Sequence, residues 1–299
     1  MRTRRPFGDN VYGYLFLAPW LAGLTFFMAG PTLVSLYLSF TDFNLIDDPH
    51  WIAAQNYVRL FSRDTRYAQA LKVTFTYVTL AVPLNLIFAL ALAMLLNTKI
   101  RGLGAYRAIY YVPSLLGGSV AVSILWRQVF GVDGIVSRIV EFFGGEGSSW
   151  VSSPSHALWT LVILHVWQFG SPMIIFLAGL KQIPQELYEA AAIDGAGPWM
   201  RFRVVTFPML TPVLFFNLIL QIINSFQAFT PAFIVSGGTG GPLDSTLFYT
   251  LYLYYQGFAN FRMGYAAAMA WILLVIIALV TAVAFLTSRF WVHYDDAGR

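Results

Sequence analysis

The chain has 299 residues, of which 58% are hydrophobic and only 11% are charged. An ordinary soluble domain carries roughly 25% charged residues, so this chain has too few to cover a soluble surface. The composition excludes a soluble enzyme and a disordered chain, and a net charge of only +4 excludes a basic nucleic-acid-binding domain. Cysteine is absent, so there are no disulfides, thiolate metal sites or cysteine nucleophiles. We therefore expect an integral membrane protein.

Six stretches are long and apolar enough to cross the roughly 30 Å hydrocarbon core of a bilayer as helices. None of them sustains the period-two alternation of a transmembrane strand. The sequence therefore predicts an all-α, polytopic membrane protein with six transmembrane helices, and we treat residues 1–299 as a single transmembrane domain. The predicted spans are 12–40, 71–96, 108–130, 157–180, 207–235 and 265–290.

The basic residues predict how these spans are oriented. Most of the 18 Lys and Arg fall in the two termini, in the loop after the second span and in the loop after the fourth span. Basic residues favour the cytoplasmic side of a membrane, so we expect both termini and these two loops to be cytoplasmic. The residues concerned are Arg2, Arg4, Arg5, Lys99, Arg101, Arg107, Lys181, Arg201, Arg203, Arg289 and Arg299.

The loop after the fourth span, residues 182–208, has the features of a helical element outside the membrane. Pro184 suits the first turn of a helix, and residues 186–193 are good helix formers. Gly195 predicts a stop, and Pro198 can open a second short helix before the fifth span. Spacing alone leaves two interpretations open, namely a helix–turn–helix that docks a partner or a polar loop that only joins two spans.

Polar side chains gather in the fourth and fifth spans. Gln221, Asn224, Ser225 and Ala228 follow helical spacing and form one stripe. The fourth span contains Gly170 and Pro172, which can break its helix, and broken spans often mark the substrate sites of transporters. Because polar groups in a membrane are costly unless they face a water-filled cavity, this pattern favours a solute pathway. The alternative is that the amides bond neighbouring helices within the bundle.

His165 is the only ionisable side chain well inside a predicted span. A proton relay usually includes acidic groups in the membrane, and no carboxylate lies near His165 in the sequence. We therefore expect a hydrogen-bonded histidine rather than a relay. The four histidines are scattered singly, so we expect neither a metal site nor catalytic residues.

A longer motif lies in the loop after the fourth span. Glu189-Ala190-Ala191 is followed after three residues by Gly195 and after nine more by Val205-Thr206-Phe207-Pro208. This run resembles the EAA motif of ABC-importer permease subunits. Its extended form, with Ile193-Asp194-Gly195-Ala196, is similar to the carbohydrate-uptake class. Asn56-Tyr57 in the first loop resembles the first permease of such pairs, the maltose- and glycerol-phosphate-type subunit.

The resemblance implies a permease that forms half of a pathway for a sugar (a mono-, di- or oligosaccharide) and works by alternating access. The implied partners are a second permease subunit, a dimer of ATPase subunits and an extracytoplasmic sugar-binding protein, with no nucleic acid. The implied location is the cytoplasmic (inner) membrane of a bacterium or archaeon. The implied ATPase-coupling residues are Glu189, Ala190, Ala191, Asp194, Gly195 and Pro208. The implied substrate-pathway residues are Gln168, Ser171, Asn224, Ser225 and Ala228, to which the polar stripe adds Gln221.

The sequence contains no Gly-x-x-x-x-Gly-Lys-Ser/Thr, the phosphate-binding loop of many ATPases. We therefore expect a transport subunit that is not itself an enzyme and holds no cofactor, with ATP and Mg²⁺ bound by the partner ATPase. The alternative is a secondary carrier that moves a polar solute by an ion gradient. Buried acids and internal repeats would favour that alternative, and we find neither in the sequence.

Overall fold

The computed structural model describes residues 9–98, 102–145 and 147–293, and these residues form helices joined by turns. Within those ranges the only extended pairing is an isolated bridge between Thr41 and Trp51. The predicted all-α class is confirmed. The α-helices are α1 (Asp9–Gly23), α2 (Gly30–Leu38), α3 (Gln55–Ser62), α4 (Thr65–Leu95), α5 (Leu103–Leu116), α6 (Val120–Val129), α7 (Ile135–Phe142), α8 (Ala157–Trp167), α9 (Gly170–Gln182), α10 (Gln185–Ile193), α11 (Pro198–Arg201), α12 (Phe207–Phe226), α13 (Thr230–Val235), α14 (Tyr249–Tyr254) and α15 (Met263–Ser288).

The chain folds as two compact units, one formed by residues 1–64 and 253–273 and the other by residues 65–252 and 274–299. In the first unit, the buried amide of Asn56 in α3 donates to the carbonyl oxygens of Ser39 and Thr41, at 2.9 Å each. These bonds hold the segment that follows α2 against α3. The second unit contains the elements from which a functional site can be built.

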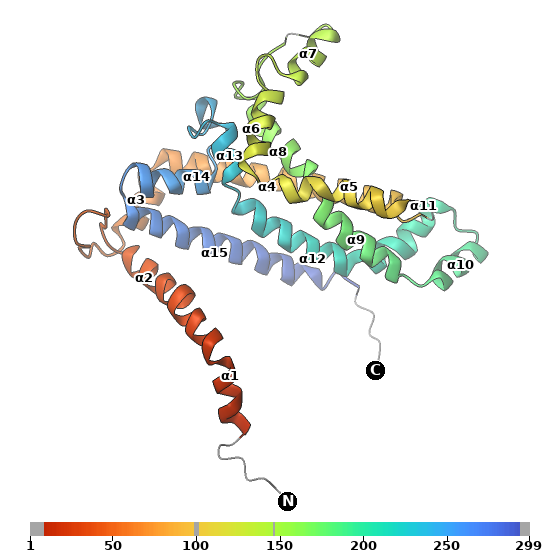
Figure 1. Ribbon diagram of the computed structural model, residues 1–299, viewed down its shortest axis with the longest axis horizontal. Coiled ribbons are helices and arrows are strands. Elements are labelled where there is room, and N and C mark those ends of the chain that lie inside the picture. Colours follow the sequence, from red (N-terminus) through yellow and green to blue (C-terminus); the bar gives the residue numbers. More distant parts are fainter. Residues whose placement is uncertain (1–8, 99–101, 146, 294–299) are drawn as a thin grey trace, which may run out of the picture. The chain divides into compact units, whose positions relative to one another are not determined.

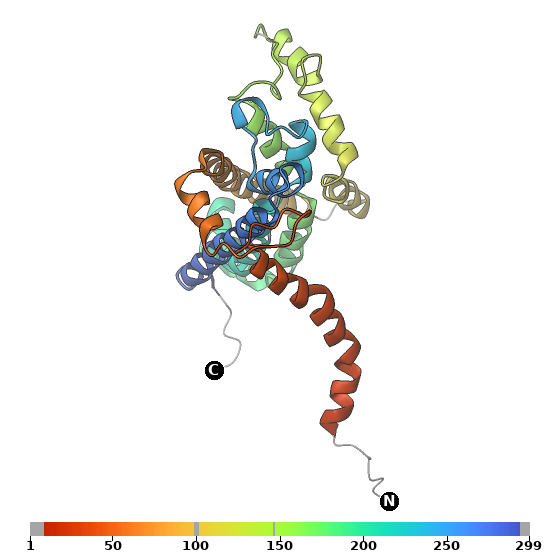
Figure 2. The same ribbon diagram turned by 90° about the vertical axis from the view of Figure 1, so that its left-hand side faces the viewer.

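In the second unit α4 packs against α8, α9 and α12, and α5 packs against α9 (Figure 1). Small residues such as Ala81 and Ala89 on α4 are fully buried, which lets neighbouring helices approach its backbone. Met173 and Phe176 of α9 are also fully buried. Within this unit α6 and α7 extend away from α4, α9 and α12 (Figure 2).

Four described helices are long and apolar enough to cross a membrane, namely Gly13–Leu38, Thr65–Leu95, Pro198–Phe226 and Met263–Ser288. Two further candidates are bent pairs, α5 with α6 at 95° and α8 with α9 at 42°. The predicted number of six is therefore reached when each bent pair counts as one span. Arg2, Arg4, Arg5 and Arg299, together with Lys99 and Arg101, lie outside the described residues.

The third span is not the straight helix predicted over 108–130. Gly117 ends α5, and Ser119 has an extended backbone and caps α6 by accepting the N–H of Val122 at 3.3 Å. Two adjacent glycines followed by a capping serine favour separate helices over a continuous one. The 95° bend follows from this local sequence.

The fifth span also differs from the prediction in its bounds. A π-helical turn joins α11 to α12 into one helix, Pro198–Phe226, so the expected second short helix runs directly into the fifth span. Pro208 has no N–H to donate, and just before it the Phe207 N–H bonds the Phe202 carbonyl in a π-helical turn. The helix ends at Phe226 instead of residue 235, and α13 follows as a separate element. Pro231 has no N–H, so a continuous helix would leave the Gln227 carbonyl without its partner, which favours an end before residue 227.

Candidate functional site

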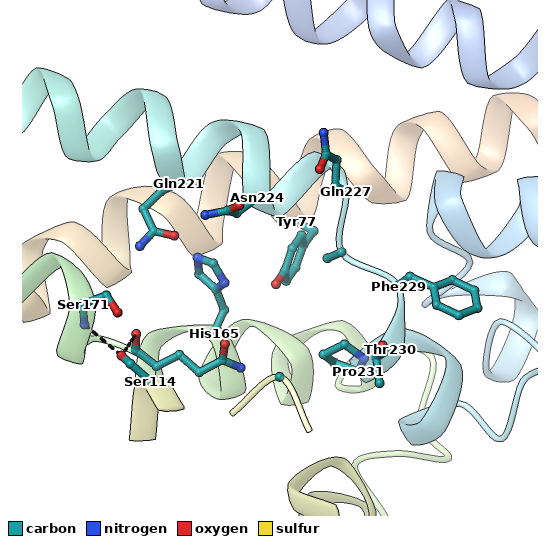
Figure 3. A pocket seen from close by; sticks show the side chains of 13 residues that line it. Tyr77, Ser114, His165, Ser171, Gln221, Asn224, Gln227, Phe229, Thr230 and Pro231 are labelled. Carbon is teal, nitrogen blue, oxygen red and sulfur yellow. Dashed lines mark hydrogen bonds between the residues drawn. The ribbon is translucent and has the colours of Figure 1, made fainter. Parts of the chain in front are cut away.

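A cavity of about 390 Å³ lies inside the second unit, among α4, α5, α8, α9 and α12. Gln221 and Asn224 of α12 point towards His165 of α8 and Ser171 of α9 (Figure 3). The Tyr77 side chain from α4 reaches the same space. Hydroxyls, amides and aromatic rings form the cavity wall, and no Lys, Arg, Asp or Glu lines it among the described residues. Such a wall suits a polar, uncharged solute.

The predicted polar stripe divides into two sets. Asn224 is exposed, Gln221 is half-buried, and both line the cavity together with Ala228. Ser225 is buried instead, and its Oγ lies 3.4 Å from Nε2 of His165. The buried Asn217 points its amide nitrogen at the Pro172 carbonyl oxygen, 3.5 Å away. The polar residues of this helix therefore include some that face the cavity and some that contact a neighbouring helix.

On the fourth span, Gln168 and Ser171 both line the cavity. They flank the break between α8 and α9, which the sequence predicted from Gly170 and Pro172. The Gln168 Nε2 donates to the Gly117 carbonyl oxygen at 3.0 Å. Its amide thus bonds the neighbouring span as well as facing the cavity.

Sequence reasoning did not identify Tyr77 or Ser114 as cavity residues. Tyr77 lies in the middle of α4, with its ring edge against His165 at 5.8 Å between centroids and near Phe248 at 4.5 Å. Nothing near Tyr77 in the sequence marks it, because its partners lie far along the chain. Ser114 directly follows Pro113 and lies shortly before Gly117, and these two residues could have indicated a helix break close to it.

The helix α10 has the predicted start and stop. It begins directly after Pro184. Two backbone hydrogen bonds cap its C-terminal end, from the Ala196 N–H to the Ala191 carbonyl at 2.9 Å and from the Gly195 N–H to the Ala192 carbonyl at 3.1 Å. Gly195 has a φ of +78°. This pattern is a Schellman motif, in which glycine adopts the left-handed conformation without strain.

Two contacts tie α10 and the turn after it to the beginning of the long helix Pro198–Phe226. The hydroxyls of Tyr188 and Thr206 lie 3.0 Å apart, and the Arg201 Nε donates to the Ala196 carbonyl oxygen at 2.8 Å. These contacts hold the α10 region directly against the start of the long helix. Because that helix also carries Gln221 and Asn224, it joins α10 to the cavity as one continuous element.

The surface of α10 carries both charged and apolar groups. Glu189, Ala190 and Asp194 are exposed, and Glu189 Oε1 accepts a bond from Gln185 Nε2 at 2.8 Å. Ile193 is 87% exposed and Trp199, just beyond α10, is 73% exposed. Large apolar side chains exposed next to charged ones are typical of a protein-binding surface. Pro208, the last residue of the predicted motif, is half-buried in the long helix.

Comparison with known proteins gives the same family. The family described as "binding-protein-dependent transport system inner membrane component" matches residues 66–291, which is more than half of the chain. The chain is 51% identical to "probable ABC transporter permease protein YesP" of Bacillus subtilis, over 96% of this chain and 94% of the relative. It is 35% identical to "lactose transport system permease protein LacF" of Rhizobium radiobacter, over 94% of this chain and 95% of the relative.

A solved structure is similar in fold. It belongs to a bacterial ABC transporter involved in the import of the acidic polysaccharide alginate, and it superimposes with a TM-score of 0.79 at 21% identity. The superposition covers 94% of this chain and 96% of the other. The helical fold of this chain is thus one that a chain of an ABC transporter also adopts.

Proposed function

Because this chain belongs to the family of inner-membrane permeases of binding-protein-dependent ABC transport systems, we propose that its cavity passes a neutral sugar. The observation that carries this proposal is the chemistry of the cavity wall. Gln221, Asn224 and Ser171 offer amides and a hydroxyl, Tyr77 and Phe229 bring aromatic rings, and no charged side chain is among the described lining residues. An anionic solute would call for Arg or Lys at the wall.

The similarity to a permease named for lactose supports a sugar as the solute. An ion-gradient-driven carrier is a different class of transporter, and family membership decides against it. The system depends on a binding protein, as its family description states. We propose that this protein is extracytoplasmic, binds the sugar and delivers it to the cavity, and that a second permease subunit completes the pathway.

We further propose that a pair of ATPase subunits docks on α10 and holds all of the ATP and Mg²⁺. The exposed Ile193 and Trp199 give the docking surface apolar area, and Glu189 offers a charge to a basic partner. Movement of α10 then reaches the cavity through the helix Pro198–Phe226. In this proposal α10 and both termini face the cytoplasm of a bacterium or archaeon.

The experiment that tests the proposed solute uses the binding protein of the same transport system. Its binding to lactose, maltose and other neutral sugars is measured by calorimetry, next to sn-glycerol 3-phosphate and an alginate oligosaccharide as anionic candidates. ATP-dependent uptake of the bound solutes is then measured in membrane vesicles that contain the complete system. We expect a neutral sugar to be bound and taken up. Binding and uptake of an anion alone would overturn the proposal.

A further inference from the structure

The two bent spans meet at their breaks. The third span breaks at residues 117–119, and the fourth at residues 168–169. The side chain of Gln168 lies over Gly117, where a Cβ atom would overlap the Gln168 Cγ. The Gln168 Nε2 also donates to the Gly117 carbonyl oxygen at 3.0 Å. A residue of the fourth span thus packs on, and bonds to, the break of the third.

The reverse contact is made by Ser114 of α5, which lies against the break of the fourth span. A Cβ atom at Gly170 would be 2.9 Å from the Ser114 Oγ. The Ser114 hydroxyl donates to the Gln168 carbonyl oxygen at 2.8 Å and accepts the Ser171 N–H at 2.9 Å (Figure 3). One hydroxyl therefore contacts the backbone on both sides of the break.

Pro172 explains why that hydroxyl is needed. In a continuous helix, the Gln168 carbonyl would accept a bond from the N–H of residue 172. Proline has no N–H, so the carbonyl loses its partner. The hydrocarbon of a bilayer offers no replacement, and a break in a span persists where protein groups or the water of a cavity satisfy the freed backbone atoms. Ser114 supplies the donor that Pro172 lacks.

We propose that Ser114 is a positioning residue whose hydroxyl replaces the backbone hydrogen bond removed by Pro172 and holds the two breaks together. We call the residues that meet at the two breaks the break clasp (Ser114, Gly117, Gln168, Gly170 and Ser171). Three of these residues, Ser114, Gln168 and Ser171, line the cavity. The break clasp thus fixes one wall of the solute pathway. This inference does not depend on which solute enters.

The absence of cysteine from the chain permits a direct test with a single reporter thiol. Ser171→Cys places it on the cavity wall next to the break, in membrane vesicles containing the complete transport system. The probe is a small, water-soluble methanethiosulfonate, and its rate of reaction with the thiol is measured. We expect Ser114→Ala to raise this rate about fivefold or more. The loss of one hydrogen bond to a buried backbone group costs about 1 kcal/mol, which corresponds to a factor of about five.

The decisive comparison is made in a Pro172→Ala background, which restores the N–H that would bond the Gln168 carbonyl in a continuous helix. There we expect Ser114→Ala to change the rate by less than about twofold, because the carbonyl has regained a partner. Thr160→Val is the matched control, since the buried Thr160 hydroxyl donates to Ala157 of its own helix. We expect this control to leave the reaction rate unchanged.

Two results would overturn the proposal. One is an unchanged reaction rate in Ser114→Ala. The other is an equal effect of Ser114→Ala in the chain that keeps Pro172 and in the Pro172→Ala background, which would mean that the hydroxyl does not stand in for the missing N–H. Thermal unfolding of each purified complex is measured in parallel, because general loosening of the fold would also increase the rate in the Thr160→Val control.

Discussion

The cavity and the surface of α10 differ in the kind of side chain that is out of its usual environment, polar in the cavity and apolar on α10. Inside the spans, where apolar groups are expected, the cavity presents Gln221, Asn224 and Ser171. Outside the spans, where polar groups are expected, the α10 region exposes Ile193 and Trp199. Each exception indicates a different contact, because polar groups in a membrane need a hydrated cavity or solute and exposed apolar groups need a protein surface.

One helix connects these two regions. Pro198–Phe226 begins beside α10, to which the Tyr188–Thr206 contact fastens it, and it carries Gln221 and Asn224 near its other end. The two regions therefore fit one mechanism, in which a partner moves one end and the solute responds at the other. Variants that separate the two regions test this view.

The largest effect is expected from reversing the charge on α10. Glu189→Lys should lower ATP-dependent uptake by roughly thirtyfold or more, as is typical when one partner of an interfacial charge pair is lost. Uptake is measured in vesicles containing the complete system, with the amount of inserted permease determined by immunoblot. Asp133→Lys makes the same charge change on an exposed residue after α6 and should be neutral. Normal uptake by Glu189→Lys would remove α10 from the mechanism.

A smaller effect is expected from the apolar part of the same surface. Ile193→Ser should weaken association with the ATPase about tenfold or more, because full burial of an isoleucine contributes about 1.5–3 kcal/mol. Association is measured by co-purification over a range of ATPase concentrations. Phe142 on α7 is similarly exposed, at 85%, and Phe142→Ser should leave association unchanged. Equal losses in both variants would mean that Ile193 has no specific role.

In the cavity, Asn224→Leu should raise the KM for uptake about threefold to tenfold, since one hydrogen bond to the solute is lost. ATPase co-purification should remain normal, which distinguishes this region from α10. The neighbouring Leu220 is 38% exposed and does not line the cavity, so Leu220→Ala is the control. A KM shift in the control but not in Asn224→Leu would contradict the assigned cavity wall.

The smallest effect comes from the turn that ends α10. Gly195 has a φ of +78° and open space around it, so Gly195→Ala costs only backbone strain of about 1 kcal/mol. We expect uptake to fall about fivefold or less. Gly197 also has open space but a φ of −69°, and Gly197→Ala should be tolerated. Equal responses of the two variants would show that the left-handed turn is not required.

Local signals in the sequence predicted the local features correctly. Pro184, Gly195 and Pro198 punctuate the chain around α10, and the helix lies between them as expected. The family expected from the motif at Glu189 is confirmed by the match over residues 66–291. Gly170 and Pro172 also predicted the break of the fourth span. In each case the determining residues are close together in the sequence.

Features that depend on tertiary packing were predicted only in part. Gln221 and Asn224 of the predicted stripe on α12 line the cavity. Ser225 of the same stripe lies against His165 instead, and only the packing of α8 near α12 decides this. Tyr77 reaches the cavity from α4, far away in the sequence. Hydropathy alone predicted a continuous third span, because two glycines and a serine barely change the mean hydropathy over a stretch as long as a span.

The most direct test of the link between the two regions is the response of a cavity thiol to nucleotide. Gln221→Cys is placed in the otherwise cysteine-free chain, and its reaction rate with a methanethiosulfonate is measured in vesicles of the complete system with and without a non-hydrolysable ATP analogue. We predict that nucleotide changes this rate several-fold when residue 189 is Glu and leaves it unchanged in Glu189→Lys. An equal nucleotide response in both backgrounds would contradict coupling of α10 to the cavity.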